Sequence, residues 1–132
     1  MTYVVCVDDR MGMLFGGRRL SRDREQLKRM RRTLGNRSLY ILPYSAKLFE
    51  ETSVCITDDP AMRKEGCALF LEEYDPAPYL RKGDHLLVYH WGRHYPSDLR
   101  MSVDLSRMRR LSSCTFVGSS HSEMLEEEYE IC

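Results

Sequence analysis

Two kinds of hydrophobic pattern alternate along this chain of 132 residues. Residues 3–7 form a continuous, valine-rich apolar run, which is typical of a strand buried on both faces. In residues 20–35 the apolar positions recur with the period of a helix instead. Ser21 is a suitable N-cap and Gly35 a suitable C-terminal stop, so the pattern predicts a helix from residue 21 to 34.

The rest of the chain continues this alternation with shorter elements. A loop with Gly12, Gly16 and Gly17 follows the first strand. Further strands are predicted at residues 38–42, 54–57, 67–71, 84–91, 110–117 and 124–131, and short helical stretches at 45–51 and 75–80. This order predicts a single α/β domain over residues 1–132, with a mostly parallel central sheet and a C-terminal antiparallel strand pair.

The predicted helix carries a carboxylate on the face that should be buried. At about 100° per residue, Asp23 falls on the same arc as Leu27 and Met30. Burying a bare carboxylate is costly, so Asp23 must be paired, solvated or protonated, and it is the candidate catalytic residue. It could accept hydrogen bonds from the N–H edge of a pterin or guanine ring. Alternatively, it is an acid of the first helical turn, favoured by the helix dipole and paired with an arginine.

A second group of polar and aromatic residues follows the strand predicted at residues 84–91. Ligands of open α/β sheets bind at the carboxyl ends of the strands, and the first strand ends on the same side. Aromatic rings there could stack on a ligand ring, while a cation meets a phosphate or carboxylate. Alternatively, the aromatics only cover the sheet edge. The candidate ligand-binding residues of this group are Asp9, Arg10, Trp91, Arg93, His94 and Tyr95.

Charge is distributed unevenly, although the formal net charge is zero. Residues 18–37 hold nine Arg and Lys against two acids, and residues 121–132 hold five acids. We expect these faces to complement each other within the fold or across a homodimer. The basic segment contains no aromatic residue for stacking on bases, so nucleic acid is not the favoured partner.

The cysteines predict a reducing compartment. Five of them lie far apart without a C-x-x-C motif, and the first four occupy apolar runs, so we expect mostly buried, reduced thiols in a cytoplasmic protein. No signal peptide and no apolar run long enough to span a membrane is present. The sequence has no metal-binding motif and no phosphate-binding glycine loop, so no metal and no cofactor are predicted.

Several motifs are similar to those of the dihydrofolate reductase family and occur in the same order. The family's first strand and flexible loop are resembled by residues 4–13, V-V-C-V-D-D-R-M-G-M. Its substrate helix is resembled by residues 20–29, L-S-R-D-R-E-Q-L-K-R. Residues 36–49, 66–74, 84–91 and 97–106 resemble later segments. The resemblance implies a three-layer dihydrofolate reductase-like fold. It places Asp23 on the family's active-site carboxylate and Ser45 on the Thr of its G-R-x-T motif, which adds Ser45 to the candidate ligand-binding residues.

The cofactor motifs of that family are altered here. L-E-E, residues 71–73, stands where the family has the Gly-Gly that admits the cofactor pyrophosphate, and acids there would repel a phosphate. L-P-Y-S, residues 42–45, lacks the Gly and Arg of G-R-x-T. The loop that carries the family's folate-binding Arg is shortened between Glu51 and Val54. We therefore expect neither NADPH binding nor folate binding in the family's manner.

These observations lead to one main hypothesis and three alternatives. The main hypothesis is a degenerate dihydrofolate reductase-like domain that binds a heterocyclic or nucleotide-like small molecule without NADPH. The alternatives are a divergent reductase, a non-catalytic protein-interaction domain, and an RNA-binding or RNA-processing accessory that uses the Arg-rich helix. Whether the protein is an enzyme stays undecided at this level.

Overall fold

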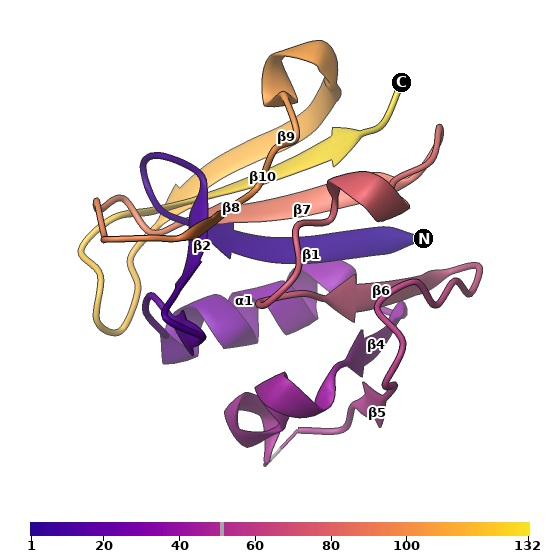
Figure 1. The fold of residues 1–132 in the computed structure, drawn as a ribbon, viewed down its shortest axis with the longest axis horizontal. Helices are drawn as coiled ribbons and strands as arrows, with labels where there is room; N and C mark the ends of the chain where they lie inside the picture. The colour runs from indigo at the N-terminus through magenta and orange to yellow at the C-terminus, as the bar shows by residue number, and fades with distance from the viewer. Residues whose placement is uncertain (51) are drawn as a thin grey trace.

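A computed structural model describes residues 1–50 and 52–132, and its centre is a twisted sheet (Figure 1). In this part of the chain, seven strands follow the order β5-β4-β6-β1-β7-β10-β9. They are β1 (Thr2–Val7), β4 (Ser38–Ile41), β5 (Cys55–Ile56), β6 (Cys67–Phe70), β7 (His85–His90), β9 (Arg109–Phe116) and β10 (Met124–Glu130). The pairs from β5 to β7 are parallel, whereas β10 is antiparallel to both β7 and β9. The predicted parallel sheet with a C-terminal antiparallel pair is confirmed.

Both faces of the sheet are buried, which explains the uninterrupted apolar runs of its central strands. Successive side chains of a strand point to opposite faces, so Tyr3 and Val5 enter one core and Val4 enters the other. The core around Val4 is covered by helix α1 (Arg24–Leu34), which contributes Met30 and Leu34. The inward face predicted from the helical period is therefore confirmed.

Shorter segments complete the outer layers. The glycine loop after β1 contains two short strands, β2 (Gly12–Phe15) and β3 (Arg18–Arg19), which form a small sheet with β8 (Leu99–Arg100). The helical stretches predicted near residues 45 and 75 are the 3₁₀ helices η1 (Pro43–Phe49) and η2 (Ala77–Tyr79), and η3 (Leu105–Arg107) follows later. The end of the first stretch, Glu51, lies outside the described residues.

The start of α1 corrects the sequence analysis. The N-cap is Asp23 and not Ser21, because Asp23 has extended backbone angles and its side chain accepts a hydrogen bond from the backbone N–H of Gln26. Both residues are suitable N-caps by type, and the chain enters the helix two residues later than predicted. The predicted stop at Gly35 is confirmed, with a positive φ of 58°.

The prediction of buried thiols is wrong for two of the first four cysteines. Cys67 is buried in a central strand, whereas Cys55 and Cys114 are exposed. Both exposed residues lie on edge strands of the sheet, β5 and β9. An edge strand can have the same apolar composition as a central strand. The exposure of the cysteine side chains therefore follows from the position of their strands in the sheet and not from the local sequence.

The basic helix and the acidic final strand complement each other within one chain. Arg29 on α1 pairs with Glu126 on β10 at 3.3 Å, and Thr33 donates a hydrogen bond to the same carboxylate. Arg37, just beyond the helix, pairs with Glu128 at 3.4 Å. These contacts account for part of the uneven charge, while the homodimer stays a prediction.

None of the helices in the described residues has the length and apolarity to cross a membrane.

Candidate functional site

The carboxylate of Asp23 is buried and accepts hydrogen bonds at both oxygens. Oδ1 accepts from the backbone N–H groups of Gln26 and Ser119, at 3.0 and 2.9 Å. Oδ2 accepts from the backbone N–H of Ser120 at 2.9 Å and lies 3.0 Å from Nδ1 of His121. The predicted inward carboxylate is therefore satisfied by the protein itself, and its partner is a histidine, not an arginine.

This environment favours the ionised form of Asp23. Burial alone would raise the pKa of the carboxyl, but the hydrogen bonds from Ser120, His121 and Ser119 outweigh burial. The net result is a pKa well below the ordinary value of 3.8. Asp23 is thus a fixed negative charge at the start of α1, where the helix dipole also favours an anion.

The residues that bind Asp23 belong to the loop between β9 and β10. Gly118 lies so close to Asp23 that a Cβ atom at this position would overlap the carboxylate. Its backbone N–H donates to the carbonyl of His121, which closes the loop on itself. Near the other end of the loop, a Cβ atom on Gly92 would also overlap the backbone carbonyl of Glu123. Two glycines therefore allow this loop to dock against the end of the sheet.

His121 joins Asp23 to two hydroxyl groups. Its side chain is buried, and its Nε2 atom lies 3.0 Å from Oγ of Ser21 and 3.3 Å from Oη of Tyr95. The ring stacks on Trp91, with a centroid distance of 4.8 Å and an interplanar angle of 27°. The sequence analysis gave Ser21 only the role of a helix N-cap and placed neither Ser21 nor His121 in a site, because 98 residues separate His121 from Asp23 and no local pattern records the contact.

A second buried carboxylate, Asp8, organises the loop after β7. Asp8 accepts hydrogen bonds from the backbone N–H groups of Arg10, Gly12 and Tyr95. Burial opposes these bonds, but they lower the pKa of Asp8 below its ordinary value. His94 lies 3.7 Å from the same carboxylate with an exposed ring. Asp8 directly follows the buried strand β1. This position could have identified it from the sequence as a candidate site residue.

The predicted group at the carboxyl ends of β1 and β7 divides into two parts. Trp91 is buried and stacks on His121, so it faces the Asp23 cluster. Asp9, Arg10 and Arg93 are exposed, and the backbone N–H of Asp9 donates to the carbonyl of Arg93. The structure thus brings the predicted residues to one edge of the sheet, where ligand binding by them stays a prediction.

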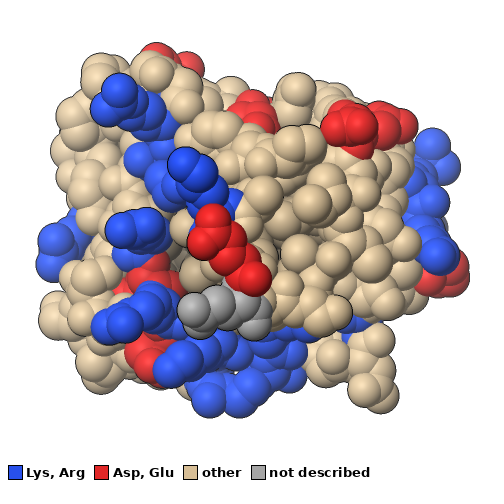
Figure 2. Space-filling model, turned by 90° about the horizontal axis from the view of Figure 1, so that it is seen from below, with Lys and Arg blue, Asp and Glu red and all other residues tan. Residues whose placement is uncertain are grey.

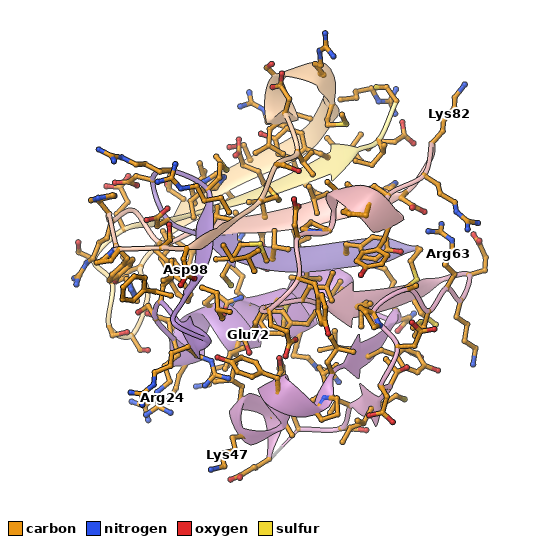
Figure 3. All side chains as sticks on the ribbon, viewed as in Figure 1. Arg24, Lys47, Arg63, Glu72, Lys82 and Asp98 are labelled. Atoms are coloured by element: carbon orange, nitrogen blue, oxygen red, sulfur yellow. The ribbon has the colours of Figure 1, made fainter. Side chains whose placement is uncertain are left out.

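Ser45 occupies a different environment from the other predicted residues. It is fully buried, and its hydroxyl donates to Glu72 at 2.8 Å. Glu72 also forms two hydrogen bonds with the guanidinium of Arg19, at 2.8 and 3.0 Å. Figure 3 shows Glu72 in the interior of the molecule, just beyond β6. The two arginine bonds neutralise an acid that the sequence analysis expected to repel a phosphate.

The space between Asp23 and Glu72 is nearly filled. Two cavities of about 10 Å³ each adjoin Cys6, Ser21, Glu72 and Trp91, which leaves room for an object of about one water molecule. Burial raises the pKa of the Cys6 thiol well above its ordinary value, so the thiol is protonated. Nε2 of the buried Gln26, which lines one cavity, has no hydrogen-bond partner among the described residues.

The large open space of the molecule is a groove between α1 and η1. It has two adjoining parts of about 650 and 500 Å³, which share Arg24, Leu27, Lys47 and Leu48. Figure 2 shows this side of the molecule, where Lys and Arg side chains gather with a few acids among them. We call this space the basic groove. Its cationic residues are Arg22, Arg24, Lys28, Arg31, Arg32 and Lys47, and its apolar floor is Leu27, Leu48 and Phe49.

The described part of the chain has neither a cluster of metal ligands nor, at the turn after β6, a pair of glycines. No group of three His, Cys, Asp or Glu side chains there could hold a metal ion. Leu71 and Glu72 are both buried with full side chains, so this turn offers no glycine pair at which a pyrophosphate could approach the backbone. The nearby Arg19 is engaged by Glu72.

Comparison with known proteins identifies the fold. No protein-family model matches the sequence, and no curated protein is significantly similar to it. A solved structure that matches is dihydrofolate reductase from Enterococcus faecalis complexed with NADP(H) and RAB-propyl. The superposition has a TM-score of 0.60 at 10% sequence identity and covers 98% of this chain and 94% of the enzyme. The chain therefore has a dihydrofolate reductase-like α/β fold, as its motifs predicted.

Proposed function

We propose that this protein binds an anionic, nucleotide-like small molecule in the basic groove. The observation that carries the proposal is the pairing of clustered cations with an apolar floor in one open space. Arg24 and Lys47 line both parts of the groove, and Figure 3 shows them on the same side of the molecule. Guanidinium and ammonium groups suit phosphate oxygens, while the half-buried Leu27 and Leu48 suit the face of a ring.

The size of the groove supports a small molecule. Ligand pockets of small molecules commonly enclose about 300–1,000 Å³. The larger part of the groove, at about 650 Å³, falls within this range. The groove also lies beside Asp23, which lines its smaller part. A ligand there would contact the helix that carries the predicted catalytic residue.

A nicotinamide cofactor is not part of the proposal. The Enterococcus enzyme is complexed with NADP(H), but the present chain has buried side chains at the turn predicted to face a cofactor pyrophosphate. The full side chain of Glu72 occupies that turn, and the hydrogen bonds from Arg19 and Ser45 hold its carboxylate in place. The proposed ligand therefore binds at α1 and η1 and not across the carboxyl ends of the strands.

Isothermal titration calorimetry with GMP, ATP and NADPH tests this proposal. The charge reversals Arg24→Glu and Lys47→Glu should weaken nucleotide binding about tenfold or more, because each replaces a favourable phosphate contact by a repulsive one. Lys82→Glu is the matched control, since Lys82 is exposed on the far side of the molecule (Figure 3). This variant should bind like the wild type.

Three results would contradict the proposal. Equal binding by the groove variants and the control would place the ligand elsewhere. Tight NADPH binding that survives Lys47→Glu would restore the divergent reductase. A salt-dependent gel shift with single-stranded RNA, without calorimetric binding of nucleotides, would favour the RNA-binding alternative, because phosphate contacts dominate such complexes.

A further inference from the structure

We propose that Ser21, His121 and Asp23 form a nucleophilic relay that cleaves carboxylic esters, with the anionic part of the substrate held in the basic groove. The choice of an anionic ester rests on the proposed function, whereas the relay itself stands on its own geometry. None of the motifs identified in the sequence points to this activity. The three residues come from the segment before α1, the N-cap of that helix and the β9–β10 loop.

The distances match the arrangement that activates a serine. Oγ of Ser21 lies 3.0 Å from Nε2 of His121, and Nδ1 of the same ring lies 3.0 Å from Oδ2 of Asp23. Relays of this kind are recognised by geometry and role, and they occur on unrelated folds in every chain order. Here the order along the chain is Ser, Asp, His.

The surroundings of His121 select the tautomer that the relay needs. Asp23 is ionised and accepts at Oδ2, so we assign the ring proton to Nδ1, which leaves Nε2 as the acceptor for Ser21. The stacked indole of Trp91 fixes the plane of the ring. Oη of Tyr95, at 3.3 Å, is a second hydroxyl close to Nε2 and lies farther away than Ser21.

A buried donor beside Ser21 provides a place for the oxyanion. Ser21 is partly exposed and also lines the cavity of about 10 Å³ that contains the side chain of Gln26. Nε2 of Gln26 is a buried donor without a partner in the described residues, and the cavity has room for a single oxygen atom. Side-chain amides serve as oxyanion donors when they are held in place before the reaction.

The cavity and the basic groove adjoin each other. Both are lined by Arg22, Asp23, Leu27 and Leu48. An ester whose carbonyl oxygen enters the cavity can therefore extend its other half into the groove. Lys47 and Arg24 line that part of the groove and would contact a carboxylate or phosphate on the substrate.

The reaction has two balanced steps. Oγ of Ser21 bonds to the carbonyl carbon and its proton passes to Nε2 of His121; the ester C–O bond then breaks, and the leaving alcohol takes that proton. Next, a water molecule attacks the acyl carbon while His121 accepts its proton. The bond to Ser21 breaks, the proton returns to Oγ, and a carboxylic acid is released. Asp23 positions the ring throughout and stabilises its charged form.

Covalent labelling tests the relay without relying on the groove. A neutral alkyl fluorophosphonate should form a Ser21 Oγ–phosphorus bond with loss of fluoride, and the adduct is located by mass spectrometry of the peptides. Ser21→Ala should lose the label, and His121→Asn should slow it at least about 100-fold. Ser112→Ala, on the exposed strand β9, should label at the wild-type rate. An unlabelled Ser21 in the folded wild type would overturn the relay.

Ester hydrolysis tests the substrate class. The wild type should cleave 5-acetoxy-2-nitrobenzoate with a kcat/KM about tenfold above that of neutral p-nitrophenyl acetate, because only the first ester carries a carboxylate. Lys47→Glu should remove this preference, and Ser21→Ala should abolish cleavage of both esters. Cleavage of both without a preference would overturn the anionic class, while the labelled Ser21 would still support the relay.

One control protects against a folding artefact. Substituting His121 or Asp23 removes contacts of the β9–β10 loop, whereas Ser21→Ala removes a hydroxyl from a partly exposed side chain. Thermal unfolding of Ser21→Ala should match that of the wild type. A folded Ser21→Ala variant that keeps the esterase activity would contradict the proposal, whatever the other variants do.

Discussion

Nδ1 of His121 lies 3.0 Å from Oδ2 of Asp23, and both side chains are nearly inaccessible to solvent. This contact joins the first turn of α1 to the loop between the last two strands. Because backbone N–H groups of Ser119 and Ser120 complete the coordination of the carboxylate, the loop has one preferred docking position. The contact is therefore structural in its own right, whether or not it supports catalysis.

Replacing Asp23 by Asn should destabilise the protein. The amide nitrogen of Asn cannot accept the hydrogen bonds that Oδ2 receives, and at least one backbone donor of the loop loses its partner. We expect a loss of about 1–3 kcal/mol in the free energy of unfolding. Urea denaturation followed by circular dichroism measures it, with the exposed Ser122→Ala as a control. An Asn variant more stable than the wild type would show that the carboxylate is strained by its environment.

The contribution of Asp23 to stability should depend on pH. Its pKa is lowered in the folded state, so the unfolded chain takes up the proton first as the pH falls. The stabilisation is fully present well above 3.8, the ordinary value, and is lost progressively as the pH falls below it. The stability difference between wild type and Asp23→Asn should therefore shrink as the pH falls below 3.8. A stability difference that grew in acid would contradict a lowered pKa of Asp23 in the folded state.

Gly118→Ala should destabilise the docked loop. An added Cβ would overlap Asp23, and the buried carboxylate is held by five hydrogen-bonding groups that cannot all shift with it. Overpacking of this kind costs about 1–3 kcal/mol. Amide hydrogen exchange should show faster exchange at Ser119 and Ser120 in this variant. Unchanged exchange would mean that the loop adapts without loss.

Arg63 should contribute more to stability than an exposed arginine. It forms two hydrogen bonds with the buried Asp84 and one with Tyr3, which tie the chain before β6 to the start of β7 and to β1. Figure 3 shows Arg63 and Lys82 on the same side of the molecule. Because the Arg63 side chain is 26% exposed and Asp84 keeps the hydrogen bond from the backbone N–H of Arg81, we expect a loss of about 1.5–3 kcal/mol, as for other hydrogen bonds to a charged group. Arg63→Met should show such a loss in thermal unfolding, and the exposed Lys82→Met should show almost none.

Local sequence patterns predicted the elements of this fold well. The strands at β1, β6 and β7 are apolar because both faces of the sheet are covered, and their composition alone shows it. The inward position of Asp23 followed from helical periodicity. The order of the motifs along the chain predicted the dihydrofolate reductase-like fold. The strand and helix inferences depend on residues within one element, whereas the fold class depends on the order of the motifs along the chain.

Contacts between distant segments could not be predicted in the same way. The partner of Asp23 is 98 residues away, and the pairing of Ser45 with Glu72 spans 27 residues. The same limit applies to Cys114, which is exposed because β9 lies at the sheet edge. The basic groove was missed because its two walls, α1 and η1, are separate elements whose charges looked like ordinary solvated surface.

The long reach of the Asp23 contacts has a consequence for biosynthesis. During translation, α1 leaves the ribosome long before residues 119–121 exist, so its N-cap carboxylate first has only Gln26 as a partner within the chain. Native contacts that are so far apart in sequence form late and slow the folding of a chain. Until residues 119–121 have been made, the Asp23 carboxylate therefore lacks its partners from the β9–β10 loop, and its enclosure depends on the last part of the chain.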